Sequence, residues 1–549
     1  MKRNPVPIVL GLVIAVLVAV LAAGQVGLLG AASTSTASPS PAAATATATP
    51  RPTETPGAIV DESPSPTTSE TPVSPAPPAG LADVPIVPVT NFRATPTSTD
   101  AKELKAVLAG TSDRYAALEL IESEADAILG AVGVDRPSDP ARLILAPDVK
   151  TLAADLAKNR KRLAVLRADA VGPEVRALAW GDAALFGVDR VKTRADWPLM
   201  AKLPAPAAGE AFDPATTWTL FAGGDILLDR GVYLTLKNKG ADYAFDGGTA
   251  TITGRCKNCS PLGWDTPYTK RTGNAGVFRD LIKSADIAAA NFENPAPNNP
   301  RFHASGTNFS ADPRFIDGLK NAGIDYVSLA NNHIRDAGAT GLLQTIANVK
   351  KRGIRYSGAG KDANAARTPA VLEAAGTNVA ILGYDAIAGS YHATATKIGS
   401  APLSAAAVRQ DAKAARAAGA DLVIVYPHWG TEYDPTPFVN QKKLAEMIID
   451  NGADMVIGNH AHWAAAMEVY KGKPIWYALG NFVFDQTWSE PTMEGITLEL
   501  TFRGKDLVQA HIRPHIILDK AQPNFLDPAG AGKVVMGQVF SASKGLLPW

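Results

Sequence analysis

The sequence contains very little cysteine and has no excess of charge of either sign. Its 549 residues include 2 cysteines, and 53 Lys+Arg balance 53 Asp+Glu. A formal net charge of zero offers no electrostatic basis for binding nucleic acid, so we expect no nucleic-acid partner. The short basic cluster at residues 158–162 is more typical of a solvated helix end than of a binding patch.

The two cysteines, Cys256 and Cys259, lie in a loop rich in Gly and Thr. A zinc site built on such a pair requires a second Cys or His pair nearby, and this region of the sequence has none. In an oxidising compartment we therefore expect a local disulfide, with free thiols as the alternative.

The N-terminus lacks polar side chains over Ile8–Gly24, and the apolar run continues to about residue 32. An apolar run of about 20 residues spans a bilayer, whereas the core of a signal peptide has about 7–15. Lys2 and Arg3 should stay cytoplasmic by the positive-inside rule. We predict a single-pass anchor in the cell membrane at residues 1–32, with the C-terminal domain extracytoplasmic. The alternative is a cleaved signal peptide, because Ala31–Ser33 offers small residues to a peptidase.

Residues 33–100 are poor in large apolar side chains and rich in Ser, Thr, Ala and Pro. Such a segment cannot bury enough surface to offset the entropy of ordering. Repeated Pro makes the chain semi-extended, so we predict a disordered linker that lifts the rest of the protein off the membrane.

Residues 101–205 show the patterns of a small α/β accessory module. Apolar residues recur at helical spacing, for example over residues 115–120. Residues 142–145 and 162–166 are predicted strands, with a helix at residues 152–158 between them. The module contains no catalytic constellation.

In residues 206–520, apolar strands alternate with helical patterns, and glycines follow several of the helices where C-caps are expected. This alternation predicts an α/β sheet with crossover connections. After His462 the strand patterns follow one another without helices, which predicts an antiparallel addition. Residues 521–549 are predicted to be a C-terminal tail. The predicted helices are 279–284, 314–321, 342–352, 404–418 and 441–451.

Five predicted strands run directly into side chains that can bind a metal. An α/β sheet assembles a site along its carboxyl edge by placing such residues at successive strand ends. The pattern therefore predicts a metal-dependent site at this edge. The side chains are Asp225, Glu293, Asn332 with His333, His428, and the pair His460 and His462.

His460 and His462 are the sharpest single signal. In extended chain, side chains at i and i+2 point the same way, so both imidazoles could face one metal cluster. Imidazole combined with carboxylate and amide oxygens favours Zn, Mn or Fe, whereas Mg or Ca favours oxygen throughout. We predict one or two divalent ions. A pair of ions could activate water and polarise a phosphoryl or carbonyl oxygen.

Six ordered motifs resemble the CapA-type capsule-synthesis family, the poly-γ-glutamate biosynthesis proteins with a calcineurin-like metallophosphoesterase fold. The resemblance covers about residues 217–515 and implies a four-layer α/β/β/α sandwich with the site on one edge. It implies nothing about residues 1–200. The motifs are Gly224-Asp225, Asn291–Pro295, Ala330–His333 with Asp336, His428–Tyr433, His460-x-His462 and Leu479–Gln486.

The resemblance also implies a role for each site residue. Two metal positions would share one carboxylate: Asp225 and His462 at one, Asn332, His428 and His460 at the other, and Glu293 bridging them. His333 would act as the acid or transition-state stabiliser, with Asp336 beside it as a second catalytic residue. The expected substrate contacts are Asn291, Glu432, Asn481 and Asp485.

Two positions depart from the family pattern. The Asp-x-His that opens many metallophosphoesterases reads Asp225-Ile226-Leu227, so the first metal lacks one ligand. The usual small-His-Pro-His element has Ala461 in place of the Pro and keeps both imidazoles. A site with one metal, or with weak metal binding, is therefore an alternative.

We expect a membrane-anchored, extracytoplasmic protein of capsule or poly-γ-glutamate-type polymer biosynthesis, with a metal-dependent hydrolase site for a phosphoester or amide bond. The alternative is a non-catalytic accessory factor for the assembly or export of an anionic envelope polymer. A third possibility is a surface-binding protein in which residues 101–205 recognise the ligand. The expected partners are the cell membrane and the machinery that makes the envelope polymer or polyglutamate.

Overall fold

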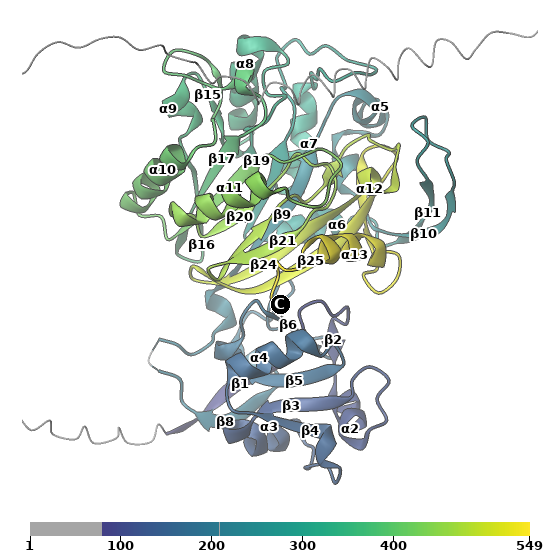
Figure 1. Ribbon diagram of the computed structural model, residues 1–549, viewed down its shortest axis with the longest axis vertical. Helices are drawn as coiled ribbons and strands as arrows, with labels where there is room; N and C mark the ends of the chain where they lie inside the picture. The colour runs from purple at the N-terminus through teal and green to yellow at the C-terminus, as the bar shows by residue number, and fades with distance from the viewer. Residues whose placement is uncertain (1–79, 208) are drawn as a thin grey trace, which may run out of the picture. The chain divides into compact units, whose positions relative to one another are not determined.

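The computed structural model describes residues 80–207 and 209–549 (Figure 1). The predicted anchor at residues 1–32 and most of the predicted linker lie outside the described residues. Within the described part of the chain, no helix is both long enough and apolar enough to cross a membrane.

The N-terminal module, residues 81–204, is built on one mixed sheet of order β4-β3-β5-β1-β6, with β8 also paired to β1. Its parallel strands β4, β3 and β5 alternate with helices, as in an α/β unit. The helix expected at residues 115–120 is wrong, because this segment is the buried strand β3. The elements are β1 Leu81–Asn91, β2 Ser98–Thr99, α2 Ala101–Ala109, β3 Ala117–Ile121, α3 Ala125–Val132, β4 Leu143–Ala146, α4 Val149–Lys158, β5 Arg162–Arg167, β6 Val175–Ala177, β7 Ala179–Trp180 and β8 Met200–Pro204.

Strand β1 corrects the predicted linker boundary at residue 100. It is buried from Val84 to its end and pairs with three other strands of the module. Its two prolines made the segment resemble the linker before it. Proline removes a backbone donor but keeps its acceptor, and the carbonyl of Pro88 accepts a hydrogen bond from the Leu178 N–H at 2.8 Å. The module therefore includes residues 81–100, which the sequence had placed in the linker.

The larger domain contains two sheets. The first has the order β11-β10-β26-β25-β24-β9-β12-β13-β14, with β23 also paired to β9, and its strands β9, β12, β13 and β14 are parallel. Its strands are β9 Thr217–Ile226, β10 Thr249–Cys256, β11 Thr266–Gly273, β12 Ile287–Phe292, β13 Tyr326–Ser328, β14 Arg355–Ser357, β23 Asn481–Val483, β24 Glu494–Arg503, β25 Asp506–Leu518 and β26 Gln522–Leu526.

The second sheet has the order β16-β17-β19-β20-β22-β21, with parallel pairing from β17 through β22. The strand ends predicted to form one edge are therefore divided between two sheets: β9, β12 and β13 belong to the first, and β19 and β20 to the second. The strands are β16 Ala370–Ala374, β17 Thr377–Asp385, β19 Leu422–His428, β20 Met455–Ile457, β21 Met467–Tyr470 and β22 Lys473–Trp476, and a small separate pair is β15 Ala359–Gly360 with β18 Gly399–Ser400.

Helices cover the outer face of each sheet, so that the domain has four layers (Figure 1). Along β9, Leu220 packs between the sheets while Phe221 packs against helices, as the two-residue period of a strand requires. Helices α5 to α8 pack on the first sheet, and α10 and α11 on the second. All five predicted helices are confirmed. The helices are α5 Arg230–Lys239, α6 Val277–Ser284, α7 Ile316–Ala322, α8 Gly338–Lys351, α9 Ala363–Ala366, α10 Ala405–Ala417, α11 Val439–Asp450, α12 Glu490–Met493 and α13 Lys533–Ala542.

The C-terminal part of the chain extends the first sheet. Strands β24 and β25 form the predicted antiparallel addition, whereas β22 pairs in parallel with β20. The predicted tail at 521–549 is wrong, because β26 pairs with β25 and β10, and α13 buries Val535 and Val539 in the core between the sheets. The larger domain therefore includes these residues.

A hairpin of β10 and β11 carries the cysteine pair. Cys256 and Cys259 form the predicted local disulfide at the end of β10, with their Cα atoms 5.6 Å apart. The link closes residues 256–259 at the start of the connection between β10 and β11, and Trp264, which is 43% exposed, lies later in the same connection. A small covalent ring in this position limits the conformations open to the hairpin tip.

Candidate metal centre

The ends of five strands from the two sheets bring the predicted ligands into one cluster. Asp225 lies at the end of β9 and Glu293 directly after β12. The β9–β12 register pairs Asp225 with Asn291, and β23 places Asn481 on the other side of Asp225. His428 ends β19 in the facing sheet. The edge predicted from the sequence is therefore a junction between two sheets.

Four side chains form what we call the four-donor group: Asn332, His428, His460 and Glu293. Their donor atoms surround Nε2 of His428, which lies 2.7 Å from Oδ1 of Asn332 and 3.1 Å from Nδ1 of His460. Oε1 of Glu293 is 3.4 Å from the same nitrogen. All of these residues except Asn332 also form a compact set of possible metal-binding atoms.

Three side chains form the three-donor group: Asp225, His462 and the same Glu293. Nδ1 of His462 is 3.5 Å from Oδ2 of Asp225, and its Nε2 is 3.8 Å from Oε1 of Glu293. The possible ligand atoms of this group all lie within 4.8 Å of one another. Glu293 is thus common to both groups, in the position expected for a bridging carboxylate.

The side chains present fit a divalent cation. Both carboxylate oxygens of Glu293 are buried and have no hydrogen-bond partner among the described residues. A buried carboxylate without partners is costly, and a cation would compensate it. Ligands about 2.0–2.2 Å from a metal lie about 3–3.5 Å from one another, which matches the spacing around His428. Imidazole, carboxylate and amide donors together suit a divalent metal, as predicted.

The electrostatics of the two groups differ. Burial and the neighbouring carboxylate of Asp225 raise the pKa of Glu293 well above its usual range. Burial lowers the pKa of His462, but the carboxylates of Glu293 and Asp225 outweigh it and raise this pKa to about 9. Burial lowers the pKa of His428 to about 4. Burial, together with the charges of His428 and His462, also lowers the pKa of His460 well below its usual value. His428 and His460 therefore offer neutral imidazoles, the form that binds metals.

Two asparagines predicted as substrate contacts bond to the ligands instead. Nδ2 of Asn291 donates to Oδ1 of Asp225 at 2.7 Å and lies 3.3 Å from Nδ1 of His428. Oδ1 of Asn481 lies 2.9 Å from Nδ1 of His462, while its amide nitrogen donates to the Thr492 carbonyl. Partners of this kind fix the orientation of metal-binding side chains. A direct substrate contact by either residue stays a prediction.

The His460–His462 segment corrects one expectation from the sequence. The two residues do not continue a strand: β20 ends at Ile457, and both histidines adopt left-handed backbone, with φ of 95° for His460 and 56° for His462. Non-glycine residues rarely adopt this region, and such residues cluster at functional sites. The two rings lie 6.1 Å apart between centroids, and each serves a different group.

His333 and Asp336 lie together beside the four-donor group. Nδ1 of His333 is 2.9 Å from Oδ2 of Asp336, and its Nε2 is 3.1 Å from Nδ2 of Asn332. The hydroxyl of Tyr391 donates to the other oxygen of Asp336 at 3.0 Å. Since a carboxylate accepts, His333 carries a proton on Nδ1 and directs Nε2 toward the metal-binding side chains. Sequence reasoning did not find Tyr391, which follows no strand or motif.

The remaining predicted substrate contacts are less close to the ligands. Asp485 forms an ion pair with Arg230 at 2.5 Å and accepts a hydrogen bond from the Gly231 N–H. Glu432 is partly exposed, and after burial and Asp225 its charge also raises the pKa of Glu293. Glu432 therefore lies near the metal-type cluster, whereas Asp485 stabilises the start of α5.

An aromatic cluster that the sequence did not indicate borders the three-donor group. Tyr433 stacks on His462 with ring centroids 5.9 Å apart, and Trp488 meets Tyr433 edge-on at 4.8 Å. Trp264, on the disulfide-closed hairpin, contacts Trp463 at 5.9 Å and Trp488 at 6.2 Å. These rings come from distant segments, so no local pattern could have joined them. Aromatic faces beside a reactive centre can position a substrate.

The pattern of side chains agrees with a known family. A model of the family described as "Bacterial capsule synthesis protein PGA_cap" matches residues 219–486, which contain all of the metal-type ligands above. The chain is therefore similar to this family over residues 219–486. The resemblance stated from the motifs is thereby confirmed.

Two curated members of the family come from Bacillus. The chain is 35% identical over 256 residues to the capsule biosynthesis protein CapA of Bacillus anthracis, covering 44% of this chain and 59% of that protein. It is 30% identical over 255 residues to the PGA biosynthesis protein CapA of Bacillus subtilis, covering 45% and 63% respectively. The chain thus spans about three fifths of the length of these relatives.

A third relative is named as an accessory protein. The probable polyglutamine synthesis accessory protein Rv0574c of Mycobacterium tuberculosis is 28% identical over 287 residues, which cover 49% of this chain and 74% of that protein. Solved structures are more distant. The calcineurin-like phosphoesterase YfkN of Bacillus subtilis is 12% identical with a TM-score of 0.32, covering 60% of this chain and 98% of that one.

Leu227 lies two residues after Asp225, at the position where the sequence departs from the Asp-x-His pattern. Leu227 is fully buried with Phe309, Phe484 and Ile517. The side chain expected to complete a metal position in many metallophosphoesterases is thus replaced by part of an apolar cluster.

Proposed function

We propose that the larger domain is a metal-dependent hydrolase that acts on a phosphoester or amide bond of an anionic envelope polymer or its precursor. The observation that carries this proposal is the buried, unpartnered carboxylate of Glu293 between two sets of nitrogen and oxygen donors. The curated relatives named for capsule or poly-glutamate biosynthesis support the class of substrate.

The ligand side chains have defined tasks in this proposal. Asp225 and His462 would hold one divalent ion, Asn332, His428 and His460 a second, and Glu293 both. Bound ions, with Zn, Mn or Fe as the metals that suit these donors, would activate a water molecule and polarise the scissile phosphoryl or carbonyl group.

His333 supplies the acid in this proposal. Asp336 accepts a hydrogen bond from the Nδ1–H of His333 and orients the ring. The protonated Nε2 would give its proton to the leaving oxygen or nitrogen. Tyr391 holds Asp336 in place through its hydroxyl. The chain's own residues thereby orient and protonate the leaving group, on the side of the four-donor group.

Metal analysis of the purified full-length protein tests the proposal, followed by assays on phosphoester and γ-glutamyl amide substrates with and without chelator. We expect bound metal, and hydrolysis that chelator abolishes and metal restores. The Glu293→Gln variant should lose both the bound metal and the hydrolytic activity. Glu119→Gln is the matched control, because Glu119 is a buried glutamate in β3, paired with Arg162. A protein without stoichiometric metal would contradict the proposal.

A second candidate is an accessory factor without catalysis. Leu227 favours it, since the three-donor group lacks a ligand, and so does the name of the Mycobacterium relative. A polymer-producing strain distinguishes the two. If the Glu293→Gln protein supports polymer formation as well as the wild type, the accessory function is correct and hydrolysis is not required.

We also propose that residues 1–32 anchor the protein in the cell membrane, with the described domains outside the cytoplasm beside the polymer-synthesis machinery. The apolar run and Lys2 and Arg3 support this arrangement. Fractionation tests it: the full chain should sediment with membranes, and a chain lacking residues 1–32 should not. Recovery of both in the same soluble fraction would contradict the anchor.

A further inference from the structure

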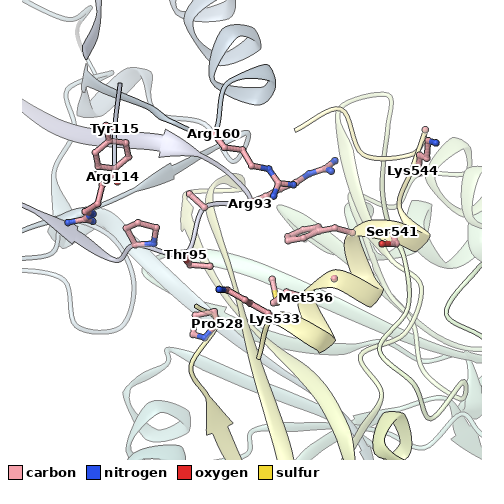
Figure 2. A pocket seen from close by; sticks show the side chains of 15 residues that line it. Arg93, Thr95, Arg114, Tyr115, Arg160, Pro528, Lys533, Met536, Ser541 and Lys544 are labelled. Carbon is pink, nitrogen blue, oxygen red and sulfur yellow. The ribbon is translucent and has the colours of Figure 1, made fainter. Parts of the chain in front are cut away.

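A cleft away from the metal-type ligands is lined by cationic side chains alone among its charged groups (Figure 2). Its volume is about 840 Å³. The described residues contribute no acidic side chain to its lining, although the whole sequence has as many acidic as basic residues. We call it the basic cleft. Its cations are Arg93, Arg114 and Arg160 from the N-terminal module, and Lys533 and Lys544 from the segment around α13.

The charges of the basic cleft are not used in ion pairs within the described chain. Arg93 donates to the backbone carbonyls of Leu547 and Trp549, and Arg114 to that of Ser98. The carbonyls of Leu547 and Ser98 are neutral acceptors. Burial, and then the charge of Arg160, lowers the pKa of Arg93, which shows that the two guanidinium groups repel each other.

The placement of Lys533 argues against a purely structural role. Arg160 and Lys544 follow the C-terminal ends of α4 and α13, where cations are favourable. Lys533, however, is the first residue of α13, where the helix dipole disfavours a cation. An anion in the cleft would offset both this cost and the repulsion between Arg93 and Arg160.

The apolar residues that line the basic cleft indicate which kind of anion would bind there. Met536 and Phe540 lie between the cations, and Arg93 is positioned over the ring of Phe540, with its guanidinium carbon 5.2 Å from the centroid. Guanidinium groups pair bidentately with carboxylates and phosphates. A chain that carries carboxylates separated by methylene groups would satisfy the cations and cover the apolar surface together.

We propose that the basic cleft is a binding site for a linear polycarboxylate, distinct from the metal-type centre. The choice of ligand rests on the proposed function, in which the substrate is an anionic envelope polymer. In this arrangement the cleft holds the polymer while one of its bonds, or a bond of its precursor, reaches the reactive centre.

Fluorescence anisotropy of labelled poly-γ-glutamate with the full-length protein tests this site. Lys533→Glu/Lys544→Glu should weaken binding about tenfold or more, because it reverses two charges that face the ligand. Both lysines are exposed, so the fold should persist. The control, Lys351→Glu/Lys413→Glu, makes the same change in net charge at exposed lysines on α8 and α10 and should change binding less than about twofold.

Further measurements distinguish binding at the basic cleft from binding at the metal centre. They also distinguish a carboxylate ligand from other anions. Hydrolysis of a small phosphoester or γ-glutamyl anilide should be unchanged in Lys533→Glu/Lys544→Glu, and polymer binding should be unchanged in His460→Ala. Equal loss of binding in the cleft and control variants would overturn the proposal, as would loss confined to His460→Ala. Binding of polyphosphate but not of poly-γ-glutamate by the wild type would overturn the choice of a carboxylate. Polymer binding can persist even if no hydrolysis is found, so the two proposals fail independently.

Discussion

The four-donor and three-donor groups share Glu293 but are held together by different forces. His428 and His460 are neutral in the four-donor group and contact each other directly, and Asn332 and Asn291 bond to His428. In the three-donor group, two carboxylates raise the pKa of His462 to about 9, so an ion pair holds the group. The four-donor group offers neutral nitrogen atoms to a cation, whereas the three-donor group already contains the positive charge of His462.

Two metal positions that lie close together therefore need not have the same affinity for a cation. A cation that enters the three-donor group must displace the proton of His462, and there it finds one ligand fewer, since Leu227 is apolar. In the four-donor group the imidazoles are already neutral and release no proton, while the shared Glu293 affects both groups alike. We therefore expect a metal to bind first and more tightly at the four-donor group.

Removing the shared carboxylate should have the largest effect. In Glu293→Gln, both groups lose a charged ligand, and we expect metal affinity at each to fall by more than the roughly 10–100-fold typical of losing an outer-shell partner. Metal analysis after dialysis measures the result. A variant that keeps the wild-type metal content would show that Glu293 does not bridge.

Replacing one histidine at a time should distinguish the ion bound by the four-donor group from the ion bound by the three-donor group. His460→Ala should eliminate the more tightly bound ion, and His462→Ala the more weakly bound one, because each ring belongs to a single group. Metal stoichiometry at a low and at a high metal concentration distinguishes the two variants. If either change removed all bound metal at both concentrations, the groups would act as one unit and the comparison would be wrong.

Asn481→Ala should weaken only the three-donor group. Oδ1 of Asn481 bonds to Nδ1 of His462, and loss of such a partner typically costs about 10–100-fold in metal affinity. Calorimetric titration measures both sites. Gln486→Ala is the control, because Gln486 bonds to the amide of Asn481 but not to the histidine. Equal loss in both variants would indicate a general loosening of the segment.

The role of Asn481 illustrates what the sequence could not provide. The motifs identified the side chains that gather in the cluster, because side chains at strand ends leave a local signature, and the periodicity placed β9, β12, β13, β19 and β20 correctly. The partner of each ligand depends on register: Asn481 reaches His462 only because β23 pairs beside β9. Pairing between distant segments is not encoded in any local pattern.

Backbone conformation and composition explain two other differences between the structure and the predictions from the sequence. The i, i+2 spacing of His460 and His462 predicted extended chain, but both residues are left-handed, a state that residue type does not reveal. Pro85 and Pro88 gave β1 the composition of a linker, although both lie in a strand of the module. Tertiary packing decided the structure in both cases.

The pH should affect the two groups differently. Because the pKa of His462 is raised to about 9, metal affinity at the three-donor group should rise about tenfold per pH unit below that value, as each cation displaces one proton. The four-donor group should show a smaller slope above about pH 6, since its imidazoles are already neutral and the shared Glu293 affects both groups alike. Titrations at about pH 6.5 and 8.5 measure the slopes, and equal slopes would contradict the difference in protonation.

Leu227→His tests whether the missing ligand accounts for the asymmetry. The new imidazole would replace an apolar side chain packed with Phe309 and Phe484, so the metal-free protein should be less stable, by about 1–3 kcal/mol. If the ring reaches the three-donor group, added Zn or Mn should restore the lost Tm and raise the affinity of this group about tenfold.

Leu228→His is the matched control, since Leu228 is equally buried but belongs to the apolar cluster beneath the helices. It should lose stability without recovery by metal, because its side chain packs away from the ligands. Recovery in both variants, or in neither, would mean that the weakness of the group comes from the proton on His462 and not from the absent ligand.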